Sequence, residues 1–336
     1  MKRTGHLLWV VVLAALAVVV VLAWRSMSRP SGGLTQAGPA PTAGPTSAPA
    51  DGQTIEALIE SARRYAANQE TGKAETVLRA SVAQHPDEPR LRAALGEILV
   101  QEDKKEEALA QYQKLIADGQ ATADIAFRAG SLAAVLGDPA LAAEEHELAQ
   151  KLDPTNPDYP IHLAQAQIAL GKIDEAKASL TRAAVLDDGR AIVWGMLAEL
   201  ALRENKLDMA EQHIAKARRL EPNVVAWRVI EARVFKRRGE AERALLLLGG
   251  LGEPDRWDPA VVKAMAECLG MLDRQNDALS LYEVAIEKRP GEPELRYEAA
   301  LWAERLGKTD RALELARQAS MMGEQRAKAV VERLGG

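Results

Sequence analysis

The sequence predicts an all-α protein built from repeated helix pairs, and three observations carry this prediction. Alanine recurs every 34 residues at eight places without insertion or deletion. A second small residue precedes each of these alanines by twelve positions. Aromatic residues make up only 4% of the chain, and its many alanines and leucines favour helices over strands. A period of this length is typical of stacked supersecondary units.

The repeat consists of eight windows of 34 residues that cover residues 55–326. The windows begin at Ile55, Pro89, Ala123, Pro157, Ala191, Val225, Pro259 and Pro293. The twentieth residue is always alanine, at Ala74, Ala108, Ala142, Ala176, Ala210, Ala244, Ala278 and Ala312. The eighth is always small, at Ala62, Gly96, Gly130, Ala164, Ala198, Ala232, Ala266 and Ala300. Small residues at both positions let the two helices of a pair approach closely.

Two further positions in the windows predict where the helices end. Proline occupies the thirty-second position of alternate windows, where it stops the second helix, at Pro86, Pro154, Pro222 and Pro290. The fifteenth position is rich in glycine and asparagine, at Gly137, Gly171, Asn205, Gly239 and Gly307. These residues suit the left-handed or open conformation in which the chain leaves the first helix.

This pattern resembles the tetratricopeptide repeat, which has small residues at positions eight and twenty and proline at thirty-two. The resemblance implies a right-handed superhelical solenoid of eight helix-turn-helix repeats. Residues 324–336 are expected to form a C-terminal capping helix and tail, which would cover the exposed face of the last repeat. Some windows depart from the signature, because the proline is replaced by Gln120, Asp188, Arg256 and Glu324.

Residues 7–24 form an uncharged apolar run of 18 residues that follows a short basic N-terminus at residues 1–6. The run is just long enough to span a bilayer as a helix, and Trp9 and Trp24 lie at its ends, where membrane interfaces favour tryptophan. We therefore expect a transmembrane helix that acts as a signal anchor. A cleaved signal peptide is the alternative, although no small-x-small cleavage site follows promptly.

Residues 25–53 are expected to form a disordered linker. The segment 28–53 contains five prolines and five glycines and has no acid before Asp51. Such a composition cannot bury enough apolar surface to offset the entropy of ordering. The linker would hold the repeats clear of the membrane.

Charge and residue usage exclude several classes of function. The only charged residues among positions 1–50 are basic, so the rest of the chain is more acidic than the total net charge of −5, which argues against nucleic-acid binding. Cys268 is the only cysteine, so no disulfide can form within the chain. His146 begins a zincin-like HEL sequence, but Gln150 stands where the second histidine is needed. We expect no metal site, no cofactor and no enzymatic activity, and keep an unrecognised enzyme as an alternative.

The resemblance implies that a peptide or protein partner binds in a concave groove lined by the first helix of each pair. The candidate residues in the third to sixth windows form an apolar stripe flanked by polar side chains. They are Phe127, Arg128, Ile161, His162, Gln165, Met196, Glu199, Ile230 and Arg233. In the alternative interpretation, the apolar members of this set only pack between adjacent first helices.

Together these features predict a membrane-anchored scaffold for protein partners. An uncharged tether behind a short basic N-terminus resembles that of bacterial envelope proteins, with the repeats on the periplasmic or extracytoplasmic side of the inner membrane. Such a scaffold would support assembly, secretion or biogenesis of envelope complexes. The alternative is a cytoplasm-facing, membrane-tethered adaptor or receptor.

Overall fold

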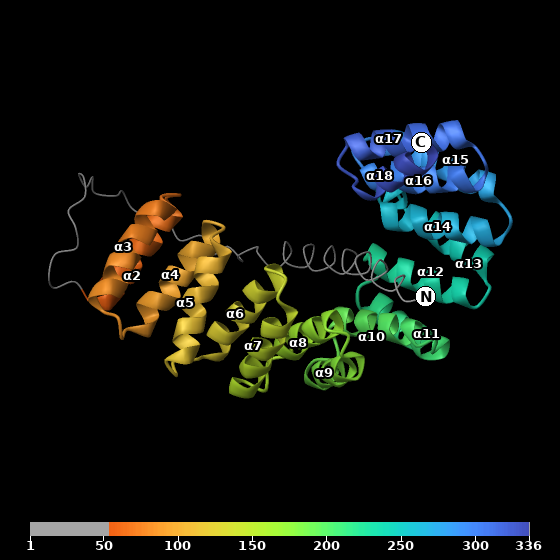
Figure 1. Cartoon of the computed structure of the whole chain (residues 1–336). Helices are drawn as coiled ribbons and strands as arrows, with labels where there is room; N and C mark the ends of the chain where they lie inside the picture. Colours follow the sequence, from red (N-terminus) through yellow and green to blue (C-terminus); the bar gives the residue numbers. More distant parts are fainter. Residues whose placement is uncertain (1–53, 336) are drawn as a thin grey trace, which may run out of the picture. The chain divides into compact units, whose positions relative to one another are not determined.

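The computed structural model describes residues 54–335, which form seventeen α-helices, one short 3₁₀ helix and no strand (Figure 1). The predicted all-helical fold is confirmed. The chain divides into two compact units, of which the first ends at Asp187 and the second begins at Asp188.

The first unit contains four consecutive helix pairs. Its helices are α2 (Ile55–Ala67), α3 (Thr71–Gln84), α4 (Pro89–Gln101), α5 (Lys105–Ala117), α6 (Ala123–Val135), α7 (Pro139–Leu152), α8 (Asp158–Ala169) and α9 (Ile173–Leu186). Each pair occupies one 34-residue window. The side chains of Thr54 and Thr122 accept hydrogen bonds from the first-turn amides of α2 and α6, which explains why these first helices begin there.

The second unit contains four more pairs and an additional helix. Its helices are α10 (Ala191–Arg203), α11 (Leu207–Leu220), α12 (Val225–Arg237), α13 (Ala241–Gly249), η1 (Asp255–Trp257), α14 (Pro259–Met271), α15 (Gln275–Lys288), α16 (Pro293–Arg305), α17 (Thr309–Met321) and α18 (Arg326–Gly335). Helix α18 packs against α16 and α17. It buries Ala327 and Val330 against them and leaves Lys328 and Glu332 exposed.

The small residues at the eighth and twentieth positions lie where paired helices touch, and all sixteen are buried. Two of the glycines are required by the rings that face them. A Cβ atom at Gly96 would lie 2.7 Å from the ring of Tyr112, and one at Gly130 would lie 2.8 Å from the ring of His146. Both distances are shorter than atoms tolerate, so a side chain at either position would force the helices apart.

The fifteenth residue of every window adopts a left-handed conformation. Five of these residues are the glycines and the asparagine expected from the sequence; the other three are Gln69, Asp103 and Asp273, with φ of 63°, 61° and 58°. At Gly239 the amide donates to the carbonyl of Lys236, and the next amide donates to that of Phe235. These two bonds satisfy carbonyl groups at the end of the first helix, so the turn is imposed by the backbone.

Helix α13 is an exception among the second helices. It has nine residues, whereas the others have 13 or 14. The glycine pair Gly249–Gly250 ends it early, and the Arg256 side chain donates hydrogen bonds to the carbonyls of Gly249 and Leu251, at 2.6 and 3.0 Å. The chain then reaches α14 through η1 instead of a final helical turn.

Several predictions fall on the N-terminal part of the chain. The basic N-terminus at 1–6, the anchor at 7–24 and the linker at 25–53 all lie outside the described residues. Within residues 54–335, no helix combines the length and the apolar character that crossing a membrane requires.

We expect Gln69→Gly to stabilise the first unit by about 0.5 kcal/mol. Glycine removes the steric cost of a side chain in the left-handed backbone conformation, and this gain exceeds the entropy that glycine adds to the unfolded chain. The reverse change at an equivalent turn, Gly239→Gln, should destabilise the second unit by about 1 kcal/mol. Urea denaturation of the two variants measures both effects. A destabilising Gln69→Gly change would show that the side chain of Gln69, and not its backbone, holds the turn.

Candidate partner-binding site

In the first unit, the candidate residues lie on the first helices α6 and α8. Phe127 is the centre of a cluster of rings, with ring centroids 5.4 Å from His146, 5.4 Å from Tyr159 and 5.0 Å from His162. The centroids of His146 and His162 are 5.4 Å apart. The structure therefore brings two of the predicted residues, Phe127 and His162, into contact. We call these four residues the histidine seam, since they join α6, α7 and α8.

Both imidazoles of the histidine seam are held in the neutral form. His146 is only 2% exposed, and burial lowers its pKa to about 3, with a smaller contribution from His162. Burial also lowers the pKa of His162, while a side-chain hydrogen bond with Gln165 acts in the opposite direction. The Nδ1 atom of His146 is buried without a hydrogen-bond partner among the described residues. The two imidazoles of the seam therefore pack as uncharged rings against Phe127 and against each other.

Arg128, which the sequence places beside this stripe, is already paired. Its Nε atom lies 2.7 Å from Asp124 on the same helix, and its Nη2 atom lies 3.3 Å from Glu97 on α4. Ile161 is 4% exposed and belongs to the core. Of the first-unit candidates, Phe127, Arg128, His162 and Gln165 are partly exposed.

In the second unit, the candidates lie on α10 and α12. Met196 is 3% exposed, so its side chain is packed in the interior. Its neighbour Gly195 lies under the ring of Trp227, where a Cβ atom would be 2.1 Å from the ring. Ile230 is partly buried against the cluster formed by α10, α11 and α12. The sequence predicted an exposed apolar stripe that includes Ile161 and Met196. Both side chains are instead packed in the interior, as the alternative interpretation proposed.

Glu199 and Arg233 form a two-pronged ion pair between α10 and α12. Nη1 of Arg233 lies 2.5 Å from Oε2 of Glu199, and Nη2 lies 3.1 Å from Oε1. The Nε atom of Arg203 is 3.6 Å from the same carboxylate. Two parallel bonds of this kind fix the relative position of the two helices as well as adding energy.

The pairing continues along the following first helices at residues that the sequence did not single out. Lys236 on α12 pairs with Glu267 on α14. Lys263 on α14 pairs with Glu298 on α16, at 2.6 Å. A signal was present in the sequence, since the ninth positions of windows five to seven alternate as Glu199, Arg233 and Glu267. We call the three interhelical pairs the charge ladder of the second unit.

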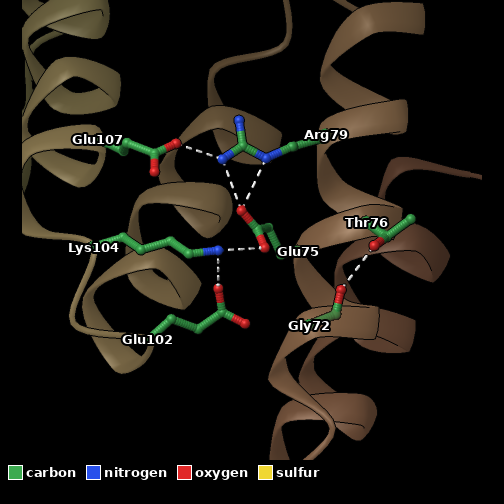
Figure 2. Close-up of polar contacts among 7 residues, drawn as sticks. All are labelled: Gly72, Glu75, Thr76, Arg79, Glu102, Lys104 and Glu107. Atoms are coloured by element: carbon green, nitrogen blue, oxygen red, sulfur yellow. Dashed lines mark hydrogen bonds and ion pairs between the residues drawn. The ribbon is translucent and has the colours of Figure 1, made fainter.

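A separate polar cluster joins the second helices α3 and α5 of the first unit. Figure 2 shows Glu75 between Arg79 and Lys104, at 2.7 and 2.8 Å, with Arg79 also bound to Glu107 and Lys104 to Glu102. Hydrogen bonds, above all from Lys104, lower the pKa of Glu75 to about 2. The cluster holds two neighbouring repeats together on the side formed by second helices.

An apolar hollow of about 430 Å³ is lined by residues of α13, η1, α14 and α15 in the second unit. Leu245, Trp257, Met265, Leu269, Leu281 and Val284 supply its apolar lining, and Arg274 and Asp277 at its edge are paired with each other at 2.6 Å. The repeat pattern does not predict this hollow, and the pair Gly249–Gly250 is the sequence feature that lies closest to it. Within the described range of residues, no group of three or more histidine, cysteine or acidic side chains is placed to hold a metal ion.

We expect Glu75→Gln to lower the free energy of unfolding of the first unit by about 1 kcal/mol at neutral pH, since Arg79 and Lys104 each lose a charged partner. The folded pKa of Glu75 is below its ordinary value of 4.5, so this stabilisation is present above pH 4.5 and disappears as the pH falls towards 2.

Denaturation at pH 7 and at pH 2.5 tests this prediction, with the exposed Glu106→Gln on α5 as the matched control. Equal effects of the two substitutions at pH 7 would show that the cluster adds nothing beyond general surface charge.

Comparisons with known proteins agree with the repeat pattern. Three models of the tetratricopeptide repeat match residues 55–98, 100–157 and 136–200. No curated protein matches the chain in sequence.

Several solved structures share the fold. A tetratricopeptide repeat protein from Parabacteroides merdae is 17% identical with a TM-score of 0.54, and the match covers 84% of this chain and 98% of that one. Yeast Tom70 is 19% identical with a TM-score of 0.57, over 86% of this chain and 66% of Tom70. The Cut9 and Hcn1 complex gives 13% identity and a TM-score of 0.51, over 84% of this chain and 56% of the matched chain. At these identities, the likeness shows the fold alone.

Proposed function

We propose that this chain, in which residues 55–98 and 100–200 match tetratricopeptide repeat models, is a non-catalytic scaffold whose first helices hold a peptide or protein partner. The observation that carries the proposal is the charge ladder, because it places paired charges of both signs on the first helices of the second unit. The structure of Cut9 as a hetero-tetramer with Hcn1 supports a protein partner for this fold.

The partner that fits the second unit presents apolar side chains between charges of both signs. Val229 and Ile230 on α12 are partly exposed and lie on the same helix as Arg233 and Lys236, which belong to the charge ladder. A partner that carries charges of only one sign would meet charges of the same sign in the ladder. In the first unit, Phe127, His162 and Gln165 offer a more aromatic surface for the same partner class.

The scaffold is membrane-anchored in this proposal. The uncharged run at 7–24 is the anchor, and the linker at 25–53 has a random-coil reach of roughly 25–30 Å that keeps the repeats clear of the bilayer. We place the repeats on the periplasmic or extracytoplasmic side of a bacterial inner membrane, where the scaffold supports assembly, secretion or biogenesis of envelope complexes. The alternative, a cytoplasm-facing adaptor, shares the anchor but reverses the topology.

A photo-crosslinking residue at Ile230 in the full-length protein, in its native cells, should capture the partner. The matched control is Ala215, an exposed position on the second helix α11 of the same unit. Capture at Ile230 and not at Ala215, identified by mass spectrometry, is the expected result. Equal capture at both positions would show that the partner does not bind specifically to the surface around Ile230.

The double change Glu199→Arg with Arg233→Glu should keep the ion pair and the fold but reverse the polarity of one step of the ladder. We expect the thermal midpoint to stay within a few degrees while capture at Ile230 falls about tenfold, since a reversed charge costs roughly 1.4 kcal/mol of binding. Unchanged capture would show that the ladder does not contact the partner.

Topology is tested by protease digestion of cells and spheroplasts. An outward-facing scaffold is degraded when spheroplasts are exposed to protease, whereas a cytoplasm-facing one is degraded only after lysis. Digestion restricted to lysed cells would overturn the envelope proposal and favour the adaptor.

A further inference from the structure

Among residues 54–335, neither His146 nor His162 forms an ion pair that could stabilise a protonated imidazole. The ring edge of His146 that carries Nδ1 lies against Gly130, where even a Cβ atom would be 2.8 Å from Nδ1. This nitrogen has no hydrogen-bond partner among the described residues, and the ring faces Phe127 and His162. An added proton would therefore place a charge between aromatic rings and helix backbone, where burial makes it costly.

The ionisable groups on the helices packed around the seam do not provide a negative charge for a protonated imidazole. On α6, Asp124 and Arg128 are bound to each other. On α8, Tyr159 is buried in the seam and Asp158 has a partner of its own. On α5, burial raises the pKa of Tyr112 to about 12, so its hydroxyl stays neutral. None of these groups supplies a free negative charge to either imidazole.

Glu145 and Glu147 on α7 flank His146 in the sequence, and Glu147 is paired with Lys151 at 2.7 Å, which leaves the carboxyl group of Glu145. It is 6% exposed, and one of its oxygens has no hydrogen-bond partner among the described residues. Burial and the nearby Glu144 raise its pKa, so it takes up a proton as the solution becomes acidic. Its linkage to stability therefore has the opposite sign from that of the histidines.

We propose that the histidine seam is an acid-sensitive latch: proton uptake by His146 and His162 separates α6, α7 and α8 and releases a partner held against Phe127. The opening of the seam follows from the geometry of the first unit alone. The release of a partner rests on the proposed function.

The sign of the effect follows from the two states of each histidine. An unfolded histidine titrates at its ordinary pKa of 6.5, whereas the folded pKa of His146 is about 3. The latch is thus fully closed above pH 6.5 and weakens as the pH falls from 6.5 towards 3. In this range His146 lowers the closing equilibrium constant by up to about tenfold per pH unit. Burial also lowers the pKa of His162, so its protonation acts in the same direction.

Hydrogen exchange measured by mass spectrometry on the full-length chain in detergent micelles tests the latch. We expect the amides of α6–α8 to lose protection by about tenfold or more between pH 7.5 and pH 5.0, after correction for the intrinsic exchange rate. The helices α14–α17 of the second unit serve as the internal reference. Glu75 is still ionised at pH 5.0, because its pKa is about 2, so its cluster does not contribute.

The double variant His146→Phe with His162→Phe keeps rings in the seam and removes its titration. It should abolish the extra loss of protection at pH 5.0, whereas the matched control His213→Phe, in the second unit, should leave α6–α8 as in the wild type. A third variant, Glu145→Gln, should increase the loss, because it removes the group whose linkage opposes that of the histidines.

Two results would overturn the latch. One is equal protection of α6–α8 at both pH values in the wild type, and the other is a loss that persists in the double variant. If the double variant does not fold, nuclear magnetic resonance titration of His146 in the wild type decides instead. A titration near pH 6.5 in the folded protein would refute the proposal, and a titration below pH 5 would support it. If the seam opens but the crosslinked partner is not lost, only the proposed release of the partner is refuted.

Discussion

The close approach of the two helices in each pair, at the eighth and twentieth positions, is the constraint on which the rest of the structure depends. All sixteen small residues there are buried, so no large side chain separates the two helices of a pair at these positions. Within each unit, side chains on the first helices of successive windows can then meet. Residues 34 positions apart can pair directly, as Glu56 does with Arg90 and Glu199 with Arg233. The functional surface is thus a consequence of packing that takes place beneath it.

Much of the fold could be predicted because its determinants are strictly periodic. Alanine at the twentieth position and glycine at the fifteenth are visible without any knowledge of contacts. The left-handed turns at Gln69, Asp103 and Asp273 were harder to predict, because these residue types do not require that conformation. The hydrogen bonds at the end of the preceding helix impose it. The early end of α13 was hidden by the unbroken 34-residue register, which continues through residues 250–258 although the helix does not.

The candidate site was predicted less well than the fold, for a physical reason. Periodicity gives the direction in which a side chain leaves its helix but not the depth at which a neighbouring helix covers it. Met196 and Ile161 occupy positions that the periodicity assigns to the expected face, and both are nevertheless buried. Conversely, Phe127 and His162 were both candidates, but their contact with each other and with His146 depends on how closely α6, α7 and α8 pack. Gly130 permits that closeness, and its role becomes clear only when the ring of His146 is placed.

The surfaces that the two units present to a partner differ in how much free energy it costs to disrupt their contacts. Ion pairs of the charge ladder are partly exposed, with Arg233 at 38% and Glu199 at 13% of their side-chain surface, and such pairs contribute only about 0–1 kcal/mol each. A partner with suitably placed charges can exchange one of these pairs for its own at little cost, so binding to the second unit needs no unfolding. The histidine seam cannot be exchanged in this way, because separating its rings exposes buried apolar surface and leaves a gap in the core. If both proposals hold, regulation by opening belongs to the first unit and recognition by charge belongs to the second.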